Sequence, residues 1–411
     1  MPVRNSSEAF IYNLCANSFF SLWCYPNPLR EDGKELCDIL VKFGGDLIIF
    51  SVKDITFNEN AADYHIAAER WSKRAVEESI NQILGAERHL ANKGSFKVKA
   101  TPGGESFEIK DIDKLRIHRV SISLGSGGSV PISSGRQEGK FIHVLTDEGF
   151  QILFEELDTI ADFVQYLAAR KDFLLNCCRS IIFHSEGDLL MLYINGNRQF
   201  PDYSDKTAVY LQDAGYEEFI KSSEYRAKKN ADQPSYIVDE IINEFIKHYN
   251  AGTLVLKSSL GNFEMALAEL ASENRFARRG VGSSIIAIGT SSPSPGRYAA
   301  RLYSGSTEKA YVIVAVPHNL TREQRYNILL ARCHVGLGLL RNKLDRLLAI
   351  GIATELHDET GMHSYDLLYY FKEKWSDDDQ REMERLQRDG KICSGVNWVQ
   401  VQEDEYPVAG S

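Results

Sequence analysis

The sequence has no long apolar run and no paired cysteine motif. None of its apolar stretches approaches the roughly 20 residues that a membrane-spanning helix needs, and the first ten residues, MPVRNSSEAF, lack the apolar core of a signal peptide. The seven cysteines are odd in number and form no Cys-x-x-Cys pair, which argues against a disulfide framework and a zinc ribbon. We therefore expect a cytoplasmic protein with reduced, mostly buried cysteines and no membrane partner.

Acidic residues outnumber basic ones in a chain of otherwise ordinary composition. The 411 residues include 57 Asp and Glu against 47 Lys and Arg, which gives a formal net charge of −10. A hydrophobic share of 43% excludes disordered and collagen-like chains, and the length allows two or three domains. A charge of −10 would argue against non-specific binding to nucleic acid if it were evenly spread.

The charge is not evenly spread, because positive residues are concentrated in residues 275–346. This segment has twelve basic and three acidic residues, a net charge of +9, so the remainder of the chain carries −19. Three arginines of the helix expected after Thr321 fall on one face, which could follow a phosphate backbone. A solvated helix face with local salt bridges is the alternative. The candidate nucleic-acid-binding residues are Arg278, Arg279, Arg322, Arg325 and Arg332.

Apolar periodicity in the first part of the chain predicts alternating helices and strands. A helix is expected over residues 6–22, and two apolar runs, 39–43 and 47–52, predict a buried β-hairpin that turns at Gly44, Gly45 and Asp46. A long helix is expected over residues 63–92. Further predicted elements are strands at 116–124, 140–145, 180–183 and 189–194, and a helix from Thr146 or Asp147 to Phe173.

A polar stretch at residues 222–235 predicts a linker between two domains. We therefore divide the chain into residues 1–222 and residues 236–411, the second of which contains the basic segment. Its predicted elements are a helix at 236–249, strands at 284–289 and 310–316, a helix from Thr321 and an amphipathic surface helix after Trp375. Both parts are expected to be α/β or α+β folds.

Candidate catalytic residues lie at the ends of the predicted hairpin. Asp38 precedes the first strand, and Ser51 and Lys53 share one face of the second strand because side chains in a strand alternate. The helix before the hairpin can bring Glu8 to the same end. Metal-assisted phosphodiester hydrolysis needs carboxylates to hold Mg²⁺ and a cation such as Lys to stabilise the developing charge.

In this order of elements the sequence resembles the PD-(D/E)XK nuclease superfamily. The resemblance covers residues 5–92 and is closest to the Holliday-junction resolvase and NERD branch, with Mrr-type restriction enzymes as further relatives. In that branch an early helix carries a Glu, and about a dozen residues separate the Asp from the acid-x-Lys; twelve residues lie between Asp38 and Ser51. Trp71 and Gln82 are similar to the aromatic residue and the Gln that follow the Lys strand in NERD-type sequences.

The resemblance implies a role for each matching residue. Glu8 and Asp38 match metal ligands, Lys53 matches the catalytic Lys, and Gln82 matches a residue placed to contact the substrate. Ser51 departs from the pattern, because the family usually has Glu, Asp or Gln there and serine is a poor Mg²⁺ ligand. Glu35, three residues before Asp38, is the leading substitute for the missing acid.

The sequence therefore predicts a restriction-endonuclease-like α/β core followed by a second α/β or α+β domain. The function that the resemblance implies is Mg²⁺- or Mn²⁺-dependent cleavage of DNA, in defence against foreign DNA, with RNA as substrate and homo-oligomerisation left open. A second hypothesis is a pseudo-nuclease that binds nucleic acid or protein without cutting. A third is that the hairpin is only structural and the functional site lies in the second half.

Overall fold

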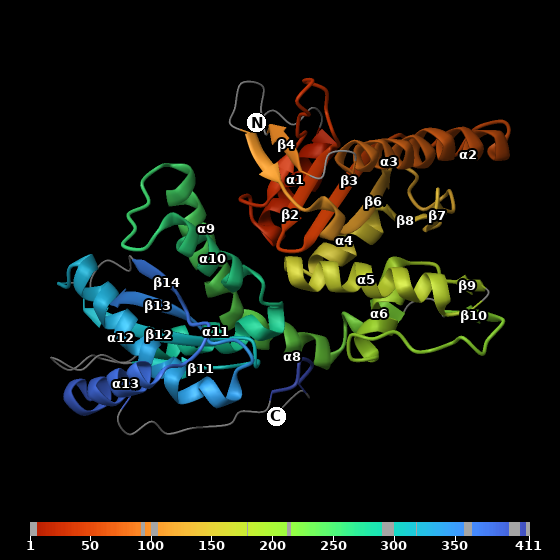
Figure 1. Ribbon diagram of the computed structural model, residues 1–411. Helices are drawn as coiled ribbons and strands as arrows, with labels where there is room; N and C mark the ends of the chain where they lie inside the picture. The colour runs from red at the N-terminus through yellow and green to blue at the C-terminus, as the bar shows by residue number, and fades with distance from the viewer. Residues whose placement is uncertain are drawn as a thin grey trace. The chain divides into compact units, whose positions relative to one another are not determined.

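The structure is a computed structural model that describes residues 6–91, 95–99, 106–178, 180–211, 215–289, 300–317, 319–356, 364–393 and 403–407. The chain divides into two compact units, residues 1–222 (unit 1) and residues 223–411 (unit 2). Each unit combines helices and strands, so the mixed α/β class is confirmed (Figure 1).

Unit 1 is built on a six-stranded sheet of order β1-β2-β3-β6-β8-β7. The central pairs β3–β6 and β6–β8 are parallel, and the other pairs are antiparallel. The predicted hairpin is confirmed as β2 and β3. The strands are β1 (Cys24–Pro26), β2 (Ile39–Phe43), β3 (Asp46–Asp54), β6 (Arg116–Leu124), β7 (Gly135–Gln137) and β8 (Lys140–Thr146), with smaller pairs β4 (Phe96–Lys99) with β5 (Ser106–Ile109) and β9 (Ser180–Ile182) with β10 (Ala208–Tyr210).

Helices cover both faces of this sheet, because its strands are apolar on both sides (Figure 1). Ile48 and Phe50 of β3 pack with α1, α4, α5 and α6, whereas Leu47 and Ile49 pack with α2 and α3. The helices of unit 1 are α1 (Ser6–Phe19), α2 (Tyr64–Ser72), the π-helical turn η1 (Lys73–Glu77), α3 (Glu78–Ala91), the 3₁₀ turn η2 (Ile112–Lys114), α4 (Asp147–Glu156), α5 (Ile160–Asn176), α6 (Glu186–Asn195) and α7 (Gly215–Phe219).

Two predicted elements of unit 1 are wrong. The single helix from residue 146 to 173 is two helices, because Thr159 caps a new start and accepts a hydrogen bond from the Asp162 amide. The strand predicted at 189–194 is part of α6, which the Ser185 side chain caps. Its short apolar run does not distinguish a buried helix from a buried strand.

Unit 2 is built on a four-stranded sheet of order β11-β12-β13-β14, in which only the central pair is parallel. One core cluster lies between this sheet and α12, where Leu329, Cys333 and Leu337 are buried, and helices α10 and α11 contact the sheet as well. The elements are α8 (Ser223–Asp232), η3 (Gln233–Ser235), α9 (Tyr236–Asn250), α10 (Leu260–Ala271), α11 (Arg275–Gly289), β11 (Ala300–Tyr303), β12 (Ala310–Pro317), α12 (Arg322–Leu340), η4 (Arg341–Lys343), β13 (Leu348–Leu356), β14 (Tyr365–Phe371) and α13 (Asp377–Gly390).

Two predictions for unit 2 also need correction. The predicted linker contains helix α8, whose Lys228 and Asp232 are buried. The strand predicted at 284–289 belongs to α11, where Val281, Ile285 and Ile288 are buried at helical spacing. In both places the structure that forms depends on what the segment packs against.

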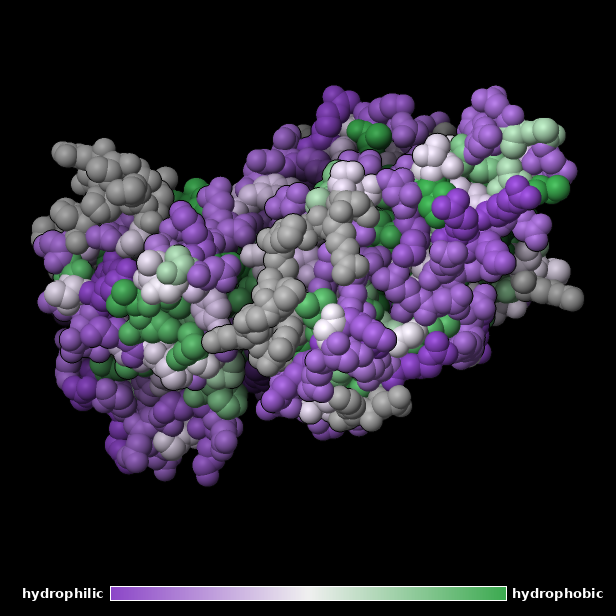
Figure 2. Space-filling model, turned by 90° about the horizontal axis from the view of Figure 1, so that it is seen from above, coloured by the Kyte–Doolittle hydropathy of each residue, from purple (hydrophilic) through white to green (hydrophobic). Residues whose placement is uncertain are grey.

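The face of the molecule drawn in Figure 2 is mostly hydrophilic. On the face drawn in Figure 2, hydrophobic residues gather in several separate groups among hydrophilic ones. Among the described residues no helix is both long and apolar enough to cross a membrane. All seven cysteines are free thiols, and five of them are buried.

Candidate functional site

The β2–β3 hairpin brings Asp38, Ser51 and Lys53 to one end of the sheet of unit 1. Ile39 pairs with Phe50, so Asp38, one residue earlier, lies opposite Ser51. The Asp38 carboxylate Oδ2 accepts a hydrogen bond of 2.6 Å from the backbone amide of Val52. The side chain of Asp38 is thereby fixed on the strand that carries Ser51 and Lys53.

Gln82 of α3 joins these three residues in one hydrogen-bonded cluster. Its Oε1 accepts from the Ser51 hydroxyl at 2.9 Å and from the Lys53 ammonium at 2.8 Å. Its Nε2 donates to Asp38 Oδ1 at 2.8 Å. The reverse amide orientation would place an N–H group against the Lys53 ammonium, so the three partners determine the orientation of the amide.

The cluster is buried at one side and reachable at the other. Asp38 is 4% exposed and Ser51 is fully buried, whereas Lys53 and Gln82 are partly exposed. The Asp38 carboxylate therefore lies on one side of the neutral Gln82 amide, and the Lys53 ammonium lies on the other. An approaching ligand meets Lys53 and Gln82 first.

Helix α3 and the turn η1 before it are held close to the sheet by two serine hydroxyls. The Ser79 hydroxyl donates to the Ser51 carbonyl at 3.3 Å, and the Ser123 hydroxyl donates to the Ala75 carbonyl at 3.2 Å. These small side chains let the helix approach the strands, so that Gln82 reaches across to Asp38. The sequence contains a sign of this close approach in β6, where the small residues Ser121 and Ser123 alternate and pair with Ser51 and Lys53.

Trp71 has a structural role near the end of α2, the helix that precedes η1 and α3. Its indole Nε1 donates to the Ile55 carbonyl at 2.5 Å, two residues after Lys53, and its side chain is buried. The π-helical turn η1 follows directly, and its Ala75 and Val76 are buried. Such turns often occur at functional sites, and here one lies over the strand that carries Lys53.

Glu8 lies near this end of the sheet, but the predicted set of three carboxylates does not form. Glu8 is buried in the first turn of α1, and the neighbouring Ser7 hydroxyl bonds to Asp54, the residue after Lys53. Glu35 is partly exposed and forms an isolated bridge with Leu29 before β2. No group of three or more His, Cys, Asp or Glu side chains in the described part of the chain could hold a metal, so Glu8, Glu35 and Asp38 are not such a group.

The prediction of nucleic-acid-binding arginines is wrong for Arg278, Arg279 and Arg325, which are at most 3% exposed. Each forms an ion pair with an acidic residue outside the basic segment: Asp239 for Arg278, Asp232 for Arg279, and Glu355 and Asp366 for Arg325. The charge count of the segment missed these partners. Buried, paired guanidinium groups cannot follow a phosphate backbone.

The other two arginines remain near the surface. Arg322 is about half exposed and donates to the Val255 carbonyl at 3.3 Å. Arg332 is partly buried and donates to the Ile328 carbonyl of its own helix at 3.4 Å. With Arg325 buried between them, they do not form the three-arginine face that the sequence predicts.

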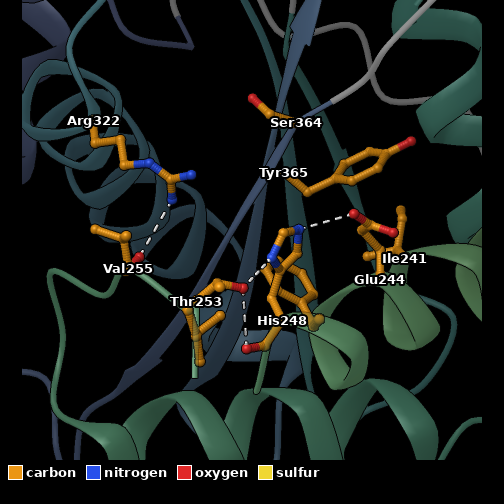
Figure 3. Close-up of a pocket in the computed structure, with 10 residues that line it drawn as sticks. Ile241, Glu244, His248, Thr253, Val255, Arg322, Ser364 and Tyr365 are labelled. Atoms are coloured by element: carbon orange, nitrogen blue, oxygen red, sulfur yellow. Dashed lines mark hydrogen bonds and ion pairs between the residues drawn. The ribbon is translucent and has the colours of Figure 1, made fainter. Parts of the chain in front are cut away.

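A small cavity of about 100 Å³ lies in unit 2, beside the end of α9 (Figure 3). In it, His248 Nδ1 lies 2.8 Å from Thr253 Oγ1, and His248 Nε2 lies 2.9 Å from Glu244 Oε1. The Thr253 amide also donates to the His248 carbonyl at 3.0 Å, so these bonds close the end of the helix. The lining residues are Ile241, Glu244, Phe245, His248, Thr253, Leu254, Val255, Arg322, Ser364 and Tyr365.

The cluster in unit 1 is therefore the better candidate site. Of the predicted catalytic residues, Asp38, Ser51, Lys53 and Gln82 are in contact through hydrogen bonds, whereas Glu8 lies in the first turn of α1, which packs on the other face of the sheet. Comparison of the chain with protein-family models, curated proteins and solved structures finds no match.

Proposed function

We propose that this protein is a divalent-metal-dependent phosphodiesterase that cleaves DNA, with Asp38 and Lys53 in its active site. The convergence of these two residues on Gln82 is the main support for the proposal. The early helix, the Asp before a strand, the hairpin, the polar-x-Lys strand and the following helix have the order found in the PD-(D/E)XK nucleases that the sequence resembles. A restriction-endonuclease-like core and a role in defence against foreign DNA are parts of the same proposal.

The oxygen donors of the cluster suit Mg²⁺ or Mn²⁺. These cations prefer carboxylate, amide carbonyl and water oxygens, and Mg²⁺ is usually held by one or two carboxylates together with substrate phosphates. Asp38 would supply a carboxylate, Gln82 would supply an amide oxygen, and Glu8 of α1 is the second carboxylate that we propose as a ligand. When bound, the metal would polarise the phosphate and activate a water molecule.

Each protein residue of the cluster then has a distinct task. Lys53 is partly exposed, so its ammonium can turn from Gln82 to a phosphate oxygen and stabilise the charge that develops there. Ser51 is fully buried, and its hydroxyl holds the Gln82 amide. Ser51 is therefore a positioning residue, and Gln82 controls the spacing between Asp38 and Lys53.

Cleavage of supercoiled plasmid by the full chain, with Mg²⁺ or Mn²⁺, tests the proposal. Asp38→Asn and Lys53→Met should each abolish cleavage. The other end of the same hairpin provides matched controls, Asp46→Asn for a buried carboxylate and Lys42→Met for a partly buried lysine. The two control variants, if folded, should still cleave the plasmid. Cleavage by Asp38→Asn and by Lys53→Met at the rate of the unmodified chain would reject the proposed active site. Parallel reactions with RNA identify the substrate class.

A second candidate function is a non-catalytic module that binds nucleic acid or protein. It is favoured by the neutral side chains of Ser51 and Gln82, which take the place between Asp38 and Lys53 where an acid is expected. Calorimetric titration of Mn²⁺ into the unmodified chain and into the Ser51→Glu variant distinguishes the nuclease from the non-catalytic module. Metal binding that strengthens in the variant supports an active site, whereas no binding in either protein supports the non-catalytic function.

A further inference from the structure

Residues 403–407 lie against helices α8 and α11 of unit 2, where Figure 1 draws them as a short dark-blue piece beside α8. Arg279 of α11 donates from its two terminal nitrogens to successive backbone carbonyls, those of Asp404 at 3.2 Å and Glu405 at 2.8 Å. The Lys228 ammonium of α8 lies over the ring of Tyr406, 5.6 Å from its centroid. The segment is therefore held through its main chain and through one aromatic side chain.

The surface beneath this segment has more positive than negative charge. Lys228 and Arg279 both bond to Asp232, at 2.8 Å and 2.7 Å, and all three residues are at most 4% exposed. Two cations thus share one carboxylate, and the two terminal nitrogens of Arg279 point to the segment. Buried cations need acceptors for their remaining donors, and an aromatic face is a favourable neighbour for an ammonium group.

The segment supplies what this surface lacks. Its two carbonyls accept from Arg279, its ring covers Lys228, and its sequence Glu-Asp-Glu-Tyr-Pro brings three negative charges to a site with an excess positive charge. We propose that α8 and α11 form a peptide-binding site that recognises a short acidic segment with a tyrosine, and that residues 403–407 are its ligand within the same chain.

This site also explains how α8 is held. The helix begins at Ser223, the first residue of unit 2, and its Lys228 contacts the segment at Tyr406. Arg279 connects Asp232 of α8 with the bound segment. Occupation of the site therefore holds α8 on α11, and loss of the segment loosens α8.

Hydrogen exchange on the full chain tests the proposal. Replacing residues 403–407 by an equally long Gly-Ser sequence should raise amide exchange in α8 by about tenfold or more, because the helix then opens locally. Exchange in α12 should stay unchanged. Millimolar free peptide Glu-Asp-Glu-Tyr-Pro should restore protection of α8, since a tethered segment has an effective concentration of this order.

Two substitutions in the full chain make the test specific. Arg279→Lys keeps a cation for Asp232 but cannot donate to both carbonyls in the same geometry, so exchange in α8 should rise even though residues 403–407 are present. The matched control is Lys229→Ala, because the Lys229 ammonium lies over the ring of Tyr225 in the same helix. Unchanged exchange in α8 after replacement of the segment would overturn the proposal. A rise in exchange that the peptide does not reverse would overturn it as well.

Discussion

Replacing Gln82 by Glu puts a second carboxylate at the centre of the candidate site. In the native cluster the amide Nε2 donates to Asp38 at 2.8 Å, while Oε1 accepts from Ser51 and Lys53. The substitution keeps both acceptor contacts but turns the third contact into one between two carboxylates. We expect the metal-free variant to be destabilised and to gain affinity for Mg²⁺ or Mn²⁺.

The magnitude follows from the contacts with Asp38 and Lys53, because both change. Loss of a hydrogen bond to a charged group, together with the repulsion between the two carboxylates, costs about 2–4 kcal/mol near pH 7. The new ion pair with the partly exposed Lys53 ammonium returns up to about 1 kcal/mol, so the expected net loss is about 1–3 kcal/mol. The loss should shrink as the pH falls, because the protonated new carboxyl can donate to Asp38 as the amide does. If the free metal concentration is a hundred times the dissociation constant, metal binding should raise the free energy of unfolding by about 2.7 kcal/mol.

Urea denaturation followed by circular dichroism, with EDTA or with Mg²⁺, measures both effects. Gln82→Ala is the control, since it removes all three hydrogen bonds of the Gln82 side chain without adding a carboxylate. It should be destabilised, and Mg²⁺ should not rescue it. If Gln82→Glu is as stable as the unmodified chain in EDTA and Mg²⁺ has no effect on it, the described cluster is not a site for a divalent metal.

Three further predictions concern the stability of unit 1. Arg170 is 1% exposed and donates to both carboxylate oxygens of Glu186, at 2.6 and 2.8 Å. Arg170→Met should therefore lower the free energy of unfolding, measured by urea denaturation, by about 3–5 kcal/mol, because it leaves a buried carboxylate without its cation. The double variant Arg170→Met/Glu186→Met should lose less. Burial and the Arg170 guanidinium hold the pKa of His143 well below its usual value of 6.5. The unfolded chain therefore binds a proton that the native chain does not as the pH falls below 6.5, and stability should drop by up to about 1.4 kcal/mol per pH unit; an equal slope in His143→Asn would contradict this. Gly125 has φ +85°, and an added Cβ would lie 2.7 Å from the backbone oxygen of Ile55, whereas Gly127 has φ +56° with no atom within 4 Å of an added Cβ. Gly125→Ala should therefore lower the stability clearly more than Gly127→Ala. Equal urea midpoints for the two variants would refute the close approach at Gly125.

The local sequence determined the hairpin and three members of the candidate site. Period-two alternation places Ser51 and Lys53 on one face, and the glycine turn sets the register that puts Asp38 opposite Ser51. The long helix after the hairpin was also predictable, since Asp63 caps it and its apolar residues recur at helical spacing. These features depend on residues that are near one another in the chain.

Tertiary structure decided how Gln82 reaches the strands and what the arginines do. Gln82 contacts Asp38 because the serines of the sheet and of α3 let the helix come close, across 44 residues of sequence. Arg278 and Arg279 lost their predicted role because Asp239 and Asp232 pack against them. The apolar runs of α6 and α11 became helices rather than strands for a similar reason, because a short buried run takes the form that its neighbours can cover. Local patterns set backbone geometry and side-chain direction, whereas the partner of each charge depends on segments that meet only when the chain folds.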